Sequence, residues 1–368
     1  MTEAFVLGGS IAGLLAAAAL SPAVDEVVLV ERGDLTAGAG RRGVPQGTQV
    51  HALLAAGQRA VEALLPGIVE EFDATGRNSK AVDWLGAAGY APPATKELRS
   101  WVSYATATVE LPSDVLPPGV AGVISHPHAG ALRGAAVVLC DNGLFQISAL
   151  GMMRADPAKD LDGLLAHLDA APSPLVAEIA RKASVVEPPV RYKVRGSLRR
   201  MWEDLPRHPE GLLMLGDSVM SFNPLYGQGM SVAACEAIRL RDILTEHGAE
   251  DPGVAGHAQR RFTEVVDTVF GIVVSLDSHY PGAEFEGVAP PSAESAAFGR
   301  ALSQLATEDA EVAPALKYAG HFFDTSALRS PGIAVKVQAW IAAGRSPAPQ
   351  DPSSVPPPLA VPQAGEAR

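Results

Sequence analysis

The sequence predicts an α/β fold that opens with a strand–turn–helix–strand unit, continues through a β-rich middle and ends in helices. Three observations predict it. An apolar strand at Ala4–Leu7 runs into the glycine turn Gly8–Gly13, and a second apolar strand follows at Val27–Val30. Two apolar runs flank Asp141-Asn-Gly143, which is a hairpin signal. From Val254 to Ala343 the apolar positions recur mainly with helical spacing.

Composition limits the kinds of partner that the chain can have. Its 368 residues are many for one simple domain, and 47% of them are hydrophobic, which is ample for a core. The net charge is -12, and no block of Lys or Arg stands out. A nucleic-acid-binding or anionic-membrane surface needs a positive stripe, so we expect neither.

The cysteine and histidine patterns argue against a disulfide framework and against a metal site. Cys140 and Cys235 are the only cysteines and form no C-x-x-C pair, which favours a reducing cytoplasm. His126-Pro-His128 has no third ligand at helical spacing, so we interpret it as a loop that contains two histidines. We therefore predict no metal.

The uncharged stretch Ala4–Val24 could also be a transmembrane helix or a signal peptide, since Gly9 and Gly13 have GxxxG spacing. A glycine pair interrupts it, and the strand-like run Glu26–Glu31 follows directly. A strand, a turn, the helix Ile11–Leu20 and a second strand explain the whole run better. We expect no membrane span.

The remaining elements follow from local patterns. A helix is predicted from Val50 to Leu65, where Pro66 and Gly67 end it. The other predicted strands are Ile68–Ala74, Trp101–Leu111, Ala135–Cys140, Leu144–Leu150 and Leu212–Leu215, with a turn at Thr75–Ser79. The other predicted helices are Leu161–Leu168, Leu175–Arg181 and Ser231–Leu244, and the Pro-rich segment 346–368 is predicted to be a disordered tail.

The turn Gly8-Gly-Ser-Ile-Ala-Gly13 has the pattern of a dinucleotide-binding fingerprint, with Ser10 in place of the middle glycine. Gly8 allows the tight turn, and Gly13 allows close packing of helix and strand. The helix N-terminus then offers N–H groups and a positive dipole to phosphates. Glu31, at the end of the second strand, is where a ribose-binding carboxylate is expected.

A second segment, GDSVMSFNPLYGQGMS, follows the apolar run Leu212–Leu215. Asp217, at the end of a strand, would face the ligand crevice of an open α/β sheet. Pro224, Gly227 and Gly229 make a loop whose backbone can lie against a flat ring, and the next helix N-terminus can stabilise negative charge.

The segments VLGGSIAGL, FDATGRNS and LLMLGDSVMSFNPLYGQGMSVAA together resemble the three FAD fingerprints of class A flavoprotein monooxygenases. The loop Arg41–Gln46 with His51, and the phrases LPRHPEGLLMLGD and SHYPG, resemble the flavin-dependent epoxidases of polyether and polyketide biosynthesis most. The resemblance extends to about Ile341. It implies a Rossmann-like FAD-binding fold of the glutathione-reductase type, with an inserted β-sheet substrate layer and a helical C-terminal part.

The resemblance also implies a domain organisation and a set of FAD contacts. Residues 1–95 and 190–250 would form a discontinuous FAD-binding domain, 96–189 a β-rich substrate domain, and 251–345 a helical region. The implied FAD-binding residues are Gly8, Ser10, Ile11, Ala12, Gly13, Glu31, Arg32, Arg42, Gln46, Asp217, Pro224, Gly227, Gln228, Gly229 and Met230.

The implied reaction is epoxidation or hydroxylation of an apolar, polyketide-like intermediate. NAD(P)H would reduce FAD, and dioxygen would form a flavin hydroperoxide that transfers one oxygen atom. The cofactor carries this chemistry, so no catalytic acid or base is expected. Candidate substrate-binding residues are Trp101, Tyr104, Phe145 and Met152, which core packing would also explain. The basic residues Arg191, Lys193, Arg195, Arg199 and Arg200 are expected on a solvated face, with an anionic substrate or NADPH as the alternative.

The chain departs from the family pattern in one place. Only Pro66–Phe72 separates the helix ending near Leu65 from the D-x-T-G-R-x-S turn, and the family's arginine-bearing helix has no counterpart there. Two alternatives therefore stay open beside the monooxygenase: a flavoprotein-fold cyclase that works without redox turnover, and a shortened non-catalytic relative.

Overall fold

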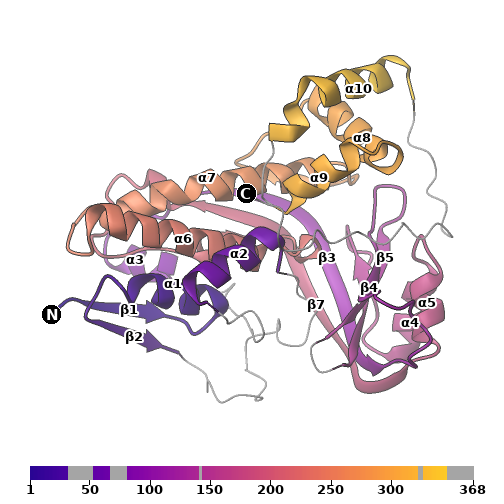
Figure 1. The fold of residues 1–368 in the computed structure, drawn as a ribbon, viewed down its shortest axis with the longest axis horizontal. Coiled ribbons are helices and arrows are strands. Elements are labelled where there is room, and N and C mark those ends of the chain that lie inside the picture. Colours follow the sequence, from indigo (N-terminus) through magenta and orange to yellow (C-terminus); the bar gives the residue numbers. More distant parts are fainter. Residues whose placement is uncertain (32–52, 67–80, 141–142, 322–325, 346–368) are drawn as a thin grey trace. The chain divides into compact units, whose positions relative to one another are not determined.

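A computed structural model describes residues 1–31, 53–66, 81–140, 143–321 and 326–345 (Figure 1). The predictions for Ile68–Ala74, the turn Thr75–Ser79 and the tail 346–368 lie outside the described residues. The chain forms two compact units. The first unit contains residues 1–102 and 193–347, and the second contains residues 103–192. The long strands β3 (Ala94–Glu110) and β7 (Ser184–Met201) each belong partly to both units.

The first unit opens with the predicted strand–helix–strand motif (Figure 1). Strands β1 (Glu3–Leu7) and β2 (Glu26–Val30) pair in parallel, with Phe5 opposite Val28. Helix α1 (Ile11–Leu20) connects them and buries Leu15 and Ala19. The opening of the chain is therefore a βαβ unit, which confirms the prediction made from its glycine turn.

Three more helices build the core of this unit. Helix α6 (Gly229–His247) lies beside α7 (Val254–Asp277), and their apolar faces share one buried cluster with α1 and α2 (Ala55–Leu64) (Figure 1). Helix α2 begins later than the predicted Val50, because Leu54 is extended and donates its backbone N–H to Ser231 Oγ on α6 at 2.7 Å. A short helix α3 (Ala81–Ala87) follows.

The predicted strand Leu212–Leu215 is wrong. This run belongs to no strand. Two of its backbone donors go to side chains: Met214 N–H to Gln259 Oε1 at 3.1 Å, and Leu215 N–H to Ser218 Oγ at 3.1 Å. A 3₁₀ turn at Gly216–Ser218 and the two-residue strand β8 (Met220–Ser221), paired with β7, come next.

The C-terminal part of the first unit is mainly helical, as predicted. Helices α8 (Ala293–Glu308), α9 (Val312–Gly320) and α10 (Pro331–Ala342) surround a small core that includes Val312, Val337 and Trp340. The short strand β9 (Glu284–Glu286) pairs with the first part of β3. No helix among the described residues is both long and apolar enough to cross a bilayer.

The second unit is an antiparallel sheet in the order β4–β5–β6–β3. Its strands β5 (Arg133–Leu139) and β6 (Phe145–Gly151) form the predicted hairpin, with Gly143 at φ +79° beside the turn. Its other elements are β4 (Gly122–Ser125), α4 (Leu161–Asp169) and α5 (Leu175–Ala180). Ala105, Ala107 and Val109 of β3 face the two helices in one buried cluster.

Candidate functional site

The turn between β1 and α1 is built as a dinucleotide fingerprint requires. Gly8 follows β1 and donates its N–H to Val30 O of β2 at 2.8 Å. Ser10 is the N-cap of α1, and its Oγ accepts the Gly13 N–H at 3.4 Å. A Cβ on Gly13 would lie 1.9 Å from Gly8 O, so only glycine fits there. The backbone N–H groups of Ile11 and Ala12 are the first of α1, so no preceding helical turn offers them a carbonyl partner.

Glu31 closes the other side of this turn. It follows β2, and its Oε2 accepts the Gly9 N–H at 2.6 Å. The carboxylate predicted to hold a ribose therefore lies against the glycine turn, and its role in ribose binding stays a prediction. Arg32, Arg42 and Gln46 lie outside the described residues.

The second predicted segment meets the first in the structure. Gly216 has a φ of +64°, and a Cβ there would lie 2.7 Å from the Ala12 Cβ on α1. Its N–H donates to Glu236 Oε2 of α6 at 2.6 Å. Two segments about two hundred residues apart in the sequence thus come into contact at the start of α1.

Asp217 lies beside the start of α6. A Cβ on Gly229 would be 3.7 Å from Asp217 Oδ1 and 3.8 Å from the Phe222 ring. Arg200 Nη1 donates to the backbone carbonyls of Asp217 and Ser218, at 3.3 and 3.4 Å. The structure therefore places Ala12 against Gly216 at the start of α1, and Asp217 against Gly229 at the start of α6.

A buried network fixes the loop between β8 and α6. Asn223 is fully buried, and its side-chain N–H groups donate to both oxygens of Asp277 on α7 at 3.2 Å. Its Oδ1 accepts the Leu225 N–H at 3.0 Å, and the Tyr226 hydroxyl donates to Asp277. Burial raises the pKa of Asp277, and burial with the nearby Asp277 charge raises the pKa of Tyr226 well above its usual value.

Gln228 and the N-terminus of α6 follow this loop. Gln228 is buried at 4% exposure, and its Oε1 has no hydrogen-bond partner among the described residues. Gly227 has a φ of +62°, and α6 begins at Gly229 with no acidic residue in its first turn. A buried acceptor beside a helix N-terminus fits a bound group that carries a donor and negative charge. Pro224 and Met230 are half-buried on either side of this stretch.

The basic cluster is not a solvated face at Arg199. This side chain is 1% exposed and is paired with Glu203, itself 6% exposed. Its Nε also donates to Asp267 Oδ1 at 3.1 Å. The prediction failed because the buried register of β7 shifts by one residue at Gly196–Ser197, which places Arg199 on the buried side although Arg195 is exposed. Lys193 and Arg195 of the same strand are exposed, as predicted.

Glu236 gives the first unit a pH dependence that can be tested. Burial raises the pKa of this fully buried carboxyl to about 8, although the Gly216 N–H and Arg199 act in the opposite direction. The folded state therefore holds a proton that the unfolded state releases from about pH 4.5 upward. We expect the free energy of unfolding to fall by roughly 3 kcal/mol as pH rises from 5 to 8.

The variant Glu236→Gln isolates this contribution. Glutamine keeps an oxygen for the Gly216 N–H but cannot ionise, so its free energy of unfolding should exceed that of the wild type at pH 8 and match it near pH 5. Urea denaturation at the two pH values measures both. An equal pH slope in the two proteins would contradict the assignment.

The candidate substrate residues do not form one group. Tyr104 is buried and its ring lies near that of Tyr192 in a tilted arrangement, with ring centroids 5.7 Å apart, on the face of the second unit's sheet away from α4 and α5. Phe145 is five ladder positions away, opposite Val109. Met152 is fully buried, and Trp101, in the first unit, donates Nε1–H to Glu284 at 3.1 Å. Their role in substrate binding stays a prediction.

Several functional residues were missed in the sequence. Glu236, Asp277 and Gln259 are buried polar groups that hold backbone or loop atoms of the site. Glu236 carried a signal: it lies four residues before Leu240 and three after Ala233, on the buried stripe of α6. Asp277 and Asn223 carried none, because their contact joins positions far apart in the sequence.

Comparison with known sequences gives one curated relative. No known family model matches the sequence. Protein Rv3254 of Mycobacterium tuberculosis is 30% identical over 173 residues, which cover 47% of this chain. The chain spans about a third (36%) of the length of that curated relative.

Three solved structures match most of the chain. The flavin-dependent brominase Bmp2 has a TM-score of 0.58 at 12% identity and covers 94% of this chain and 100% of its own. The flavin-dependent halogenase CmlS has a TM-score of 0.53 at 12% identity, covering 93% and 77%. The anhydrotetracycline hydroxylase OxyS of Streptomyces rimosus has a TM-score of 0.52 at 13% identity, covering 88% and 76%. The chain has the α/β fold of flavin-dependent monooxygenases and halogenases.

Proposed function

We propose that the chain is an FAD-dependent monooxygenase that epoxidises or hydroxylates an apolar, polyketide-like intermediate. The observation that carries this proposal is the contact between Ala12 and Gly216, which joins the two FAD fingerprints at the start of α1. The likeness in fold to a flavin-dependent hydroxylase and two flavin-dependent halogenases supports flavin-dependent oxidative chemistry in general.

The described residues fit FAD in four respects. The start of α1 after Gly8–Gly13 would take the pyrophosphate, and Glu31 would reach the adenosine ribose. Gln228 offers a buried acceptor without a partner among the described residues, and the N-terminus of α6 favours an anionic ring. When bound, FAD would supply dioxygen activation with electrons from NAD(P)H, and the protein would supply orientation and exclusion of water.

Flavin binding and NADPH oxidation test this function. The purified protein should take up one FAD, show flavin absorption, and oxidise NADPH faster when a hydrophobic alkene is added. Gln228→Leu should weaken FAD binding by about tenfold, because it removes one buried acceptor. Gln304→Leu, a change at a half-buried position of α8 that is remote from the fingerprints in the sequence, is the matched control and should bind FAD as the wild type does.

A cyclase without redox turnover is the second candidate. The short Pro66–Phe72 link favours it, because it leaves no residues for the family's arginine-bearing helix. The same experiment separates the two: product formation with bound flavin but without NADPH or dioxygen would support the cyclase. A protein that takes up no FAD would exclude the monooxygenase.

A further inference from the structure

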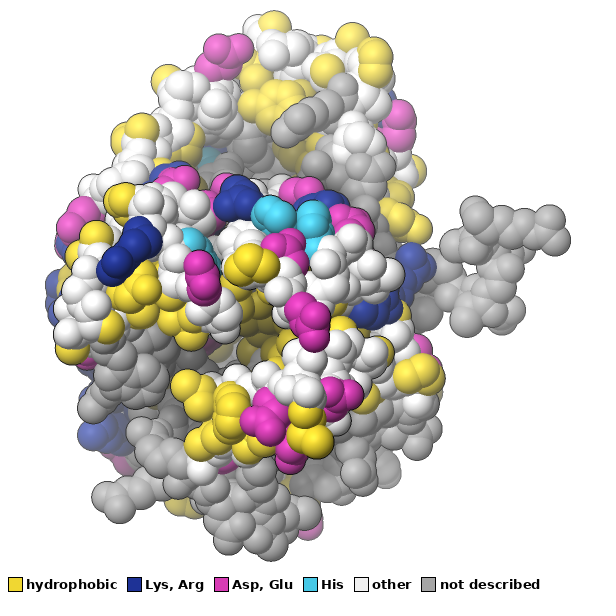
Figure 2. All heavy atoms as spheres, turned by 90° about the vertical axis from the view of Figure 1, so that its left-hand side faces the viewer, with side chains coloured by type: hydrophobic (Ala, Val, Ile, Leu, Met, Phe, Trp, Pro, Cys, Tyr) yellow, Lys and Arg dark blue, Asp and Glu magenta, His cyan; other side chains and the backbone are white. Residues whose placement is uncertain are grey.

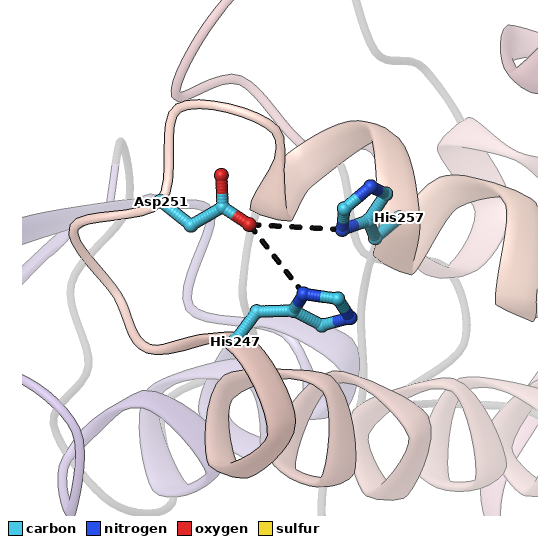
Figure 3. A group of neighbouring side chains, drawn as sticks. All are labelled: His247, Asp251 and His257. Atoms are coloured by element: carbon cyan, nitrogen blue, oxygen red, sulfur yellow. Dashed lines mark ion pairs between the residues drawn. The ribbon is translucent and has the colours of Figure 1, made fainter.

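A group of two histidines and one aspartate lies where α6 ends and α7 begins (Figure 3). His247 is the last residue of α6, Asp251 lies in the connection, and His257 is in the first turn of α7. One nitrogen or oxygen atom from each residue lies within 4.8 Å of the others. Figure 2 shows histidine, basic (Lys or Arg) and acidic side chains gathered on one face of the molecule. All three residues belong to the first unit and lie outside the proposed FAD site.

The distances in this group fit a shared cation better than hydrogen bonds. Asp251 Oδ2 lies 3.5 Å from His247 Nδ1 and 3.7 Å from His257 Nδ1. Hydrogen bonds between such atoms are about 2.7–3.2 Å long. Ligands bound tetrahedrally to a zinc ion at about 2.0–2.2 Å are separated by about 3.3–3.6 Å. The two measured separations are close to that tetrahedral edge.

The hydrogen bonds around the group leave Asp251 Oδ2 directed to the two imidazole rings. Asp251 Oδ1 accepts the Gly253 N–H at 2.8 Å, so Oδ2 is the oxygen directed to both rings (Figure 3). His257 Nδ1 is buried and has no hydrogen-bond partner in the described part of the chain. The two imidazole rings lie 4.3 Å apart between centroids. A metal ion would give this buried ring nitrogen the partner that it lacks among the described residues.

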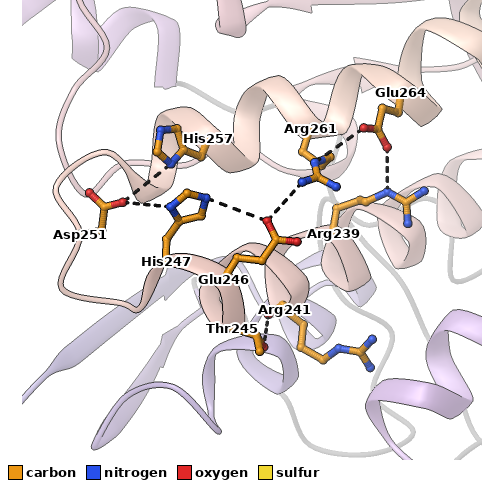
Figure 4. Close-up of polar contacts among 9 residues, drawn as sticks. All are labelled: Arg239, Arg241, Thr245, Glu246, His247, Asp251, His257, Arg261 and Glu264. Carbon is orange, nitrogen blue, oxygen red and sulfur yellow. Dashed lines mark hydrogen bonds and ion pairs between the residues drawn. The ribbon is translucent and has the colours of Figure 1, made fainter.

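A carboxylate and two helix ends lie near this group of three side chains. His247 Nε2 lies 4.0 Å from Glu246 Oε2, which in turn is 3.2 Å from Arg261 Nη2 (Figure 4). At 4.0 Å this carboxylate is too distant for a hydrogen bond to the imidazole, and it contributes only negative charge near the site. The C-terminus of α6 carries partial negative charge that stabilises a cation, whereas the N-terminus of α7 carries partial positive charge that acts against one. At 1.5 Å per residue, this site is about 27 Å along α6 from Gly229.

We propose that His247, Asp251 and His257 form a binding site for a zinc-like divalent transition metal. The ligands would be two imidazole Nδ1 atoms and one carboxylate oxygen, with further positions open to water. Two imidazoles with one carboxylate select zinc and its neighbours over magnesium, which prefers oxygen ligands. At this place the ion joins the end of α6 to the start of α7 and acts as a structural clamp on the connection 248–253.

Zinc binding to the untagged full chain tests the site. After treatment with a chelator, calorimetric titration with zinc should give one saturable site, and magnesium should give none. Saturating zinc should raise the melting temperature by a few degrees, because it binds only the folded state. His257→Asn and Asp251→Asn should each weaken zinc binding more than about tenfold, at least the loss seen when an outer partner is removed.

His128→Asn is the matched control, because His128 is an exposed histidine of the second unit. This variant should bind zinc as the wild type does. Asp251→Asn keeps the oxygen that accepts the Gly253 N–H, so it should stay folded even if His257→Asn does not, and circular dichroism checks both. Absence of a saturable zinc site, or equal zinc affinity in the wild type and Asp251→Asn, would overturn the proposal.

Discussion

Gly13→Ala is expected to destabilise the first unit by about 1–3 kcal/mol or more and to abolish FAD uptake. The added Cβ would lie 1.9 Å from Gly8 O and 3.3 Å from the Val6 side chain. Because the clash is with backbone, it cannot be relieved by a rotamer change, and α1 must move away from β1. Such a shift displaces the helix N-terminus that the proposed pyrophosphate site needs.

Gly271→Ala is the matched control for this change. Gly271 lies within α7, is exposed, and a Cβ there would meet nothing within 4 Å. Alanine should be neutral or stabilise the helix by up to about 1 kcal/mol. Thermal unfolding and FAD titration of both variants measure the difference. If the two alanine variants unfold at the same temperature, the close approach of α1 to the turn is wrong.

Arg199→Met is expected to lower the free energy of unfolding by about 3–5 kcal/mol. The change leaves the buried Glu203 carboxylate without its cation, and an uncompensated buried charge is costly. It also removes the contact with Asp267 of α7 at 3.1 Å. Urea denaturation at neutral pH measures the loss.

Arg239→Met provides the comparison for a surface pair. Arg239 and Glu264 are 36% and 54% exposed and lie 3.3 Å apart. Exposed pairs of this kind contribute less than about 1 kcal/mol. The double variant Arg199→Met with Glu203→Gln should recover part of the lost stability, because it removes the stranded charge as well. No recovery in the double variant would mean that lost packing, not the stranded charge, dominates.

Local patterns predicted much of the fold. The β1–α1–β2 unit, the hairpin of β5 and β6, and α4 to α6 follow from short-range periodicity and turn residues, which determine conformation locally. The run Leu212–Leu215 was mistaken for a strand because four apolar residues satisfy a buried strand and a segment outside any strand equally well. Its partners, Gln259 and Ser218, are side chains, and periodicity does not report them.

The candidate site was predictable only as far as its motifs extend. The glycine turn and the segment after Gly216 were located, because their chemistry requires particular residues at fixed spacing. The polar groups behind them, Glu236 and Asp277, depend on tertiary contacts across α6 and α7. The same is true of His247, Asp251 and His257. Their spacing in the sequence matches no familiar ligand motif, and the three side chains come together only because the connection 248–253 folds back.

The buried anchoring of Asn223 and Tyr226 to Asp277 has a consequence for the energetics of ligand capture. A loop that becomes ordered only around its ligand loses conformational entropy during binding, and that loss reduces affinity. Here the ordering of residues 223–226 accompanies folding, since α7 holds them. A ligand that reaches this loop therefore meets a preorganised surface, and its association needs no slow rearrangement of the backbone at that point.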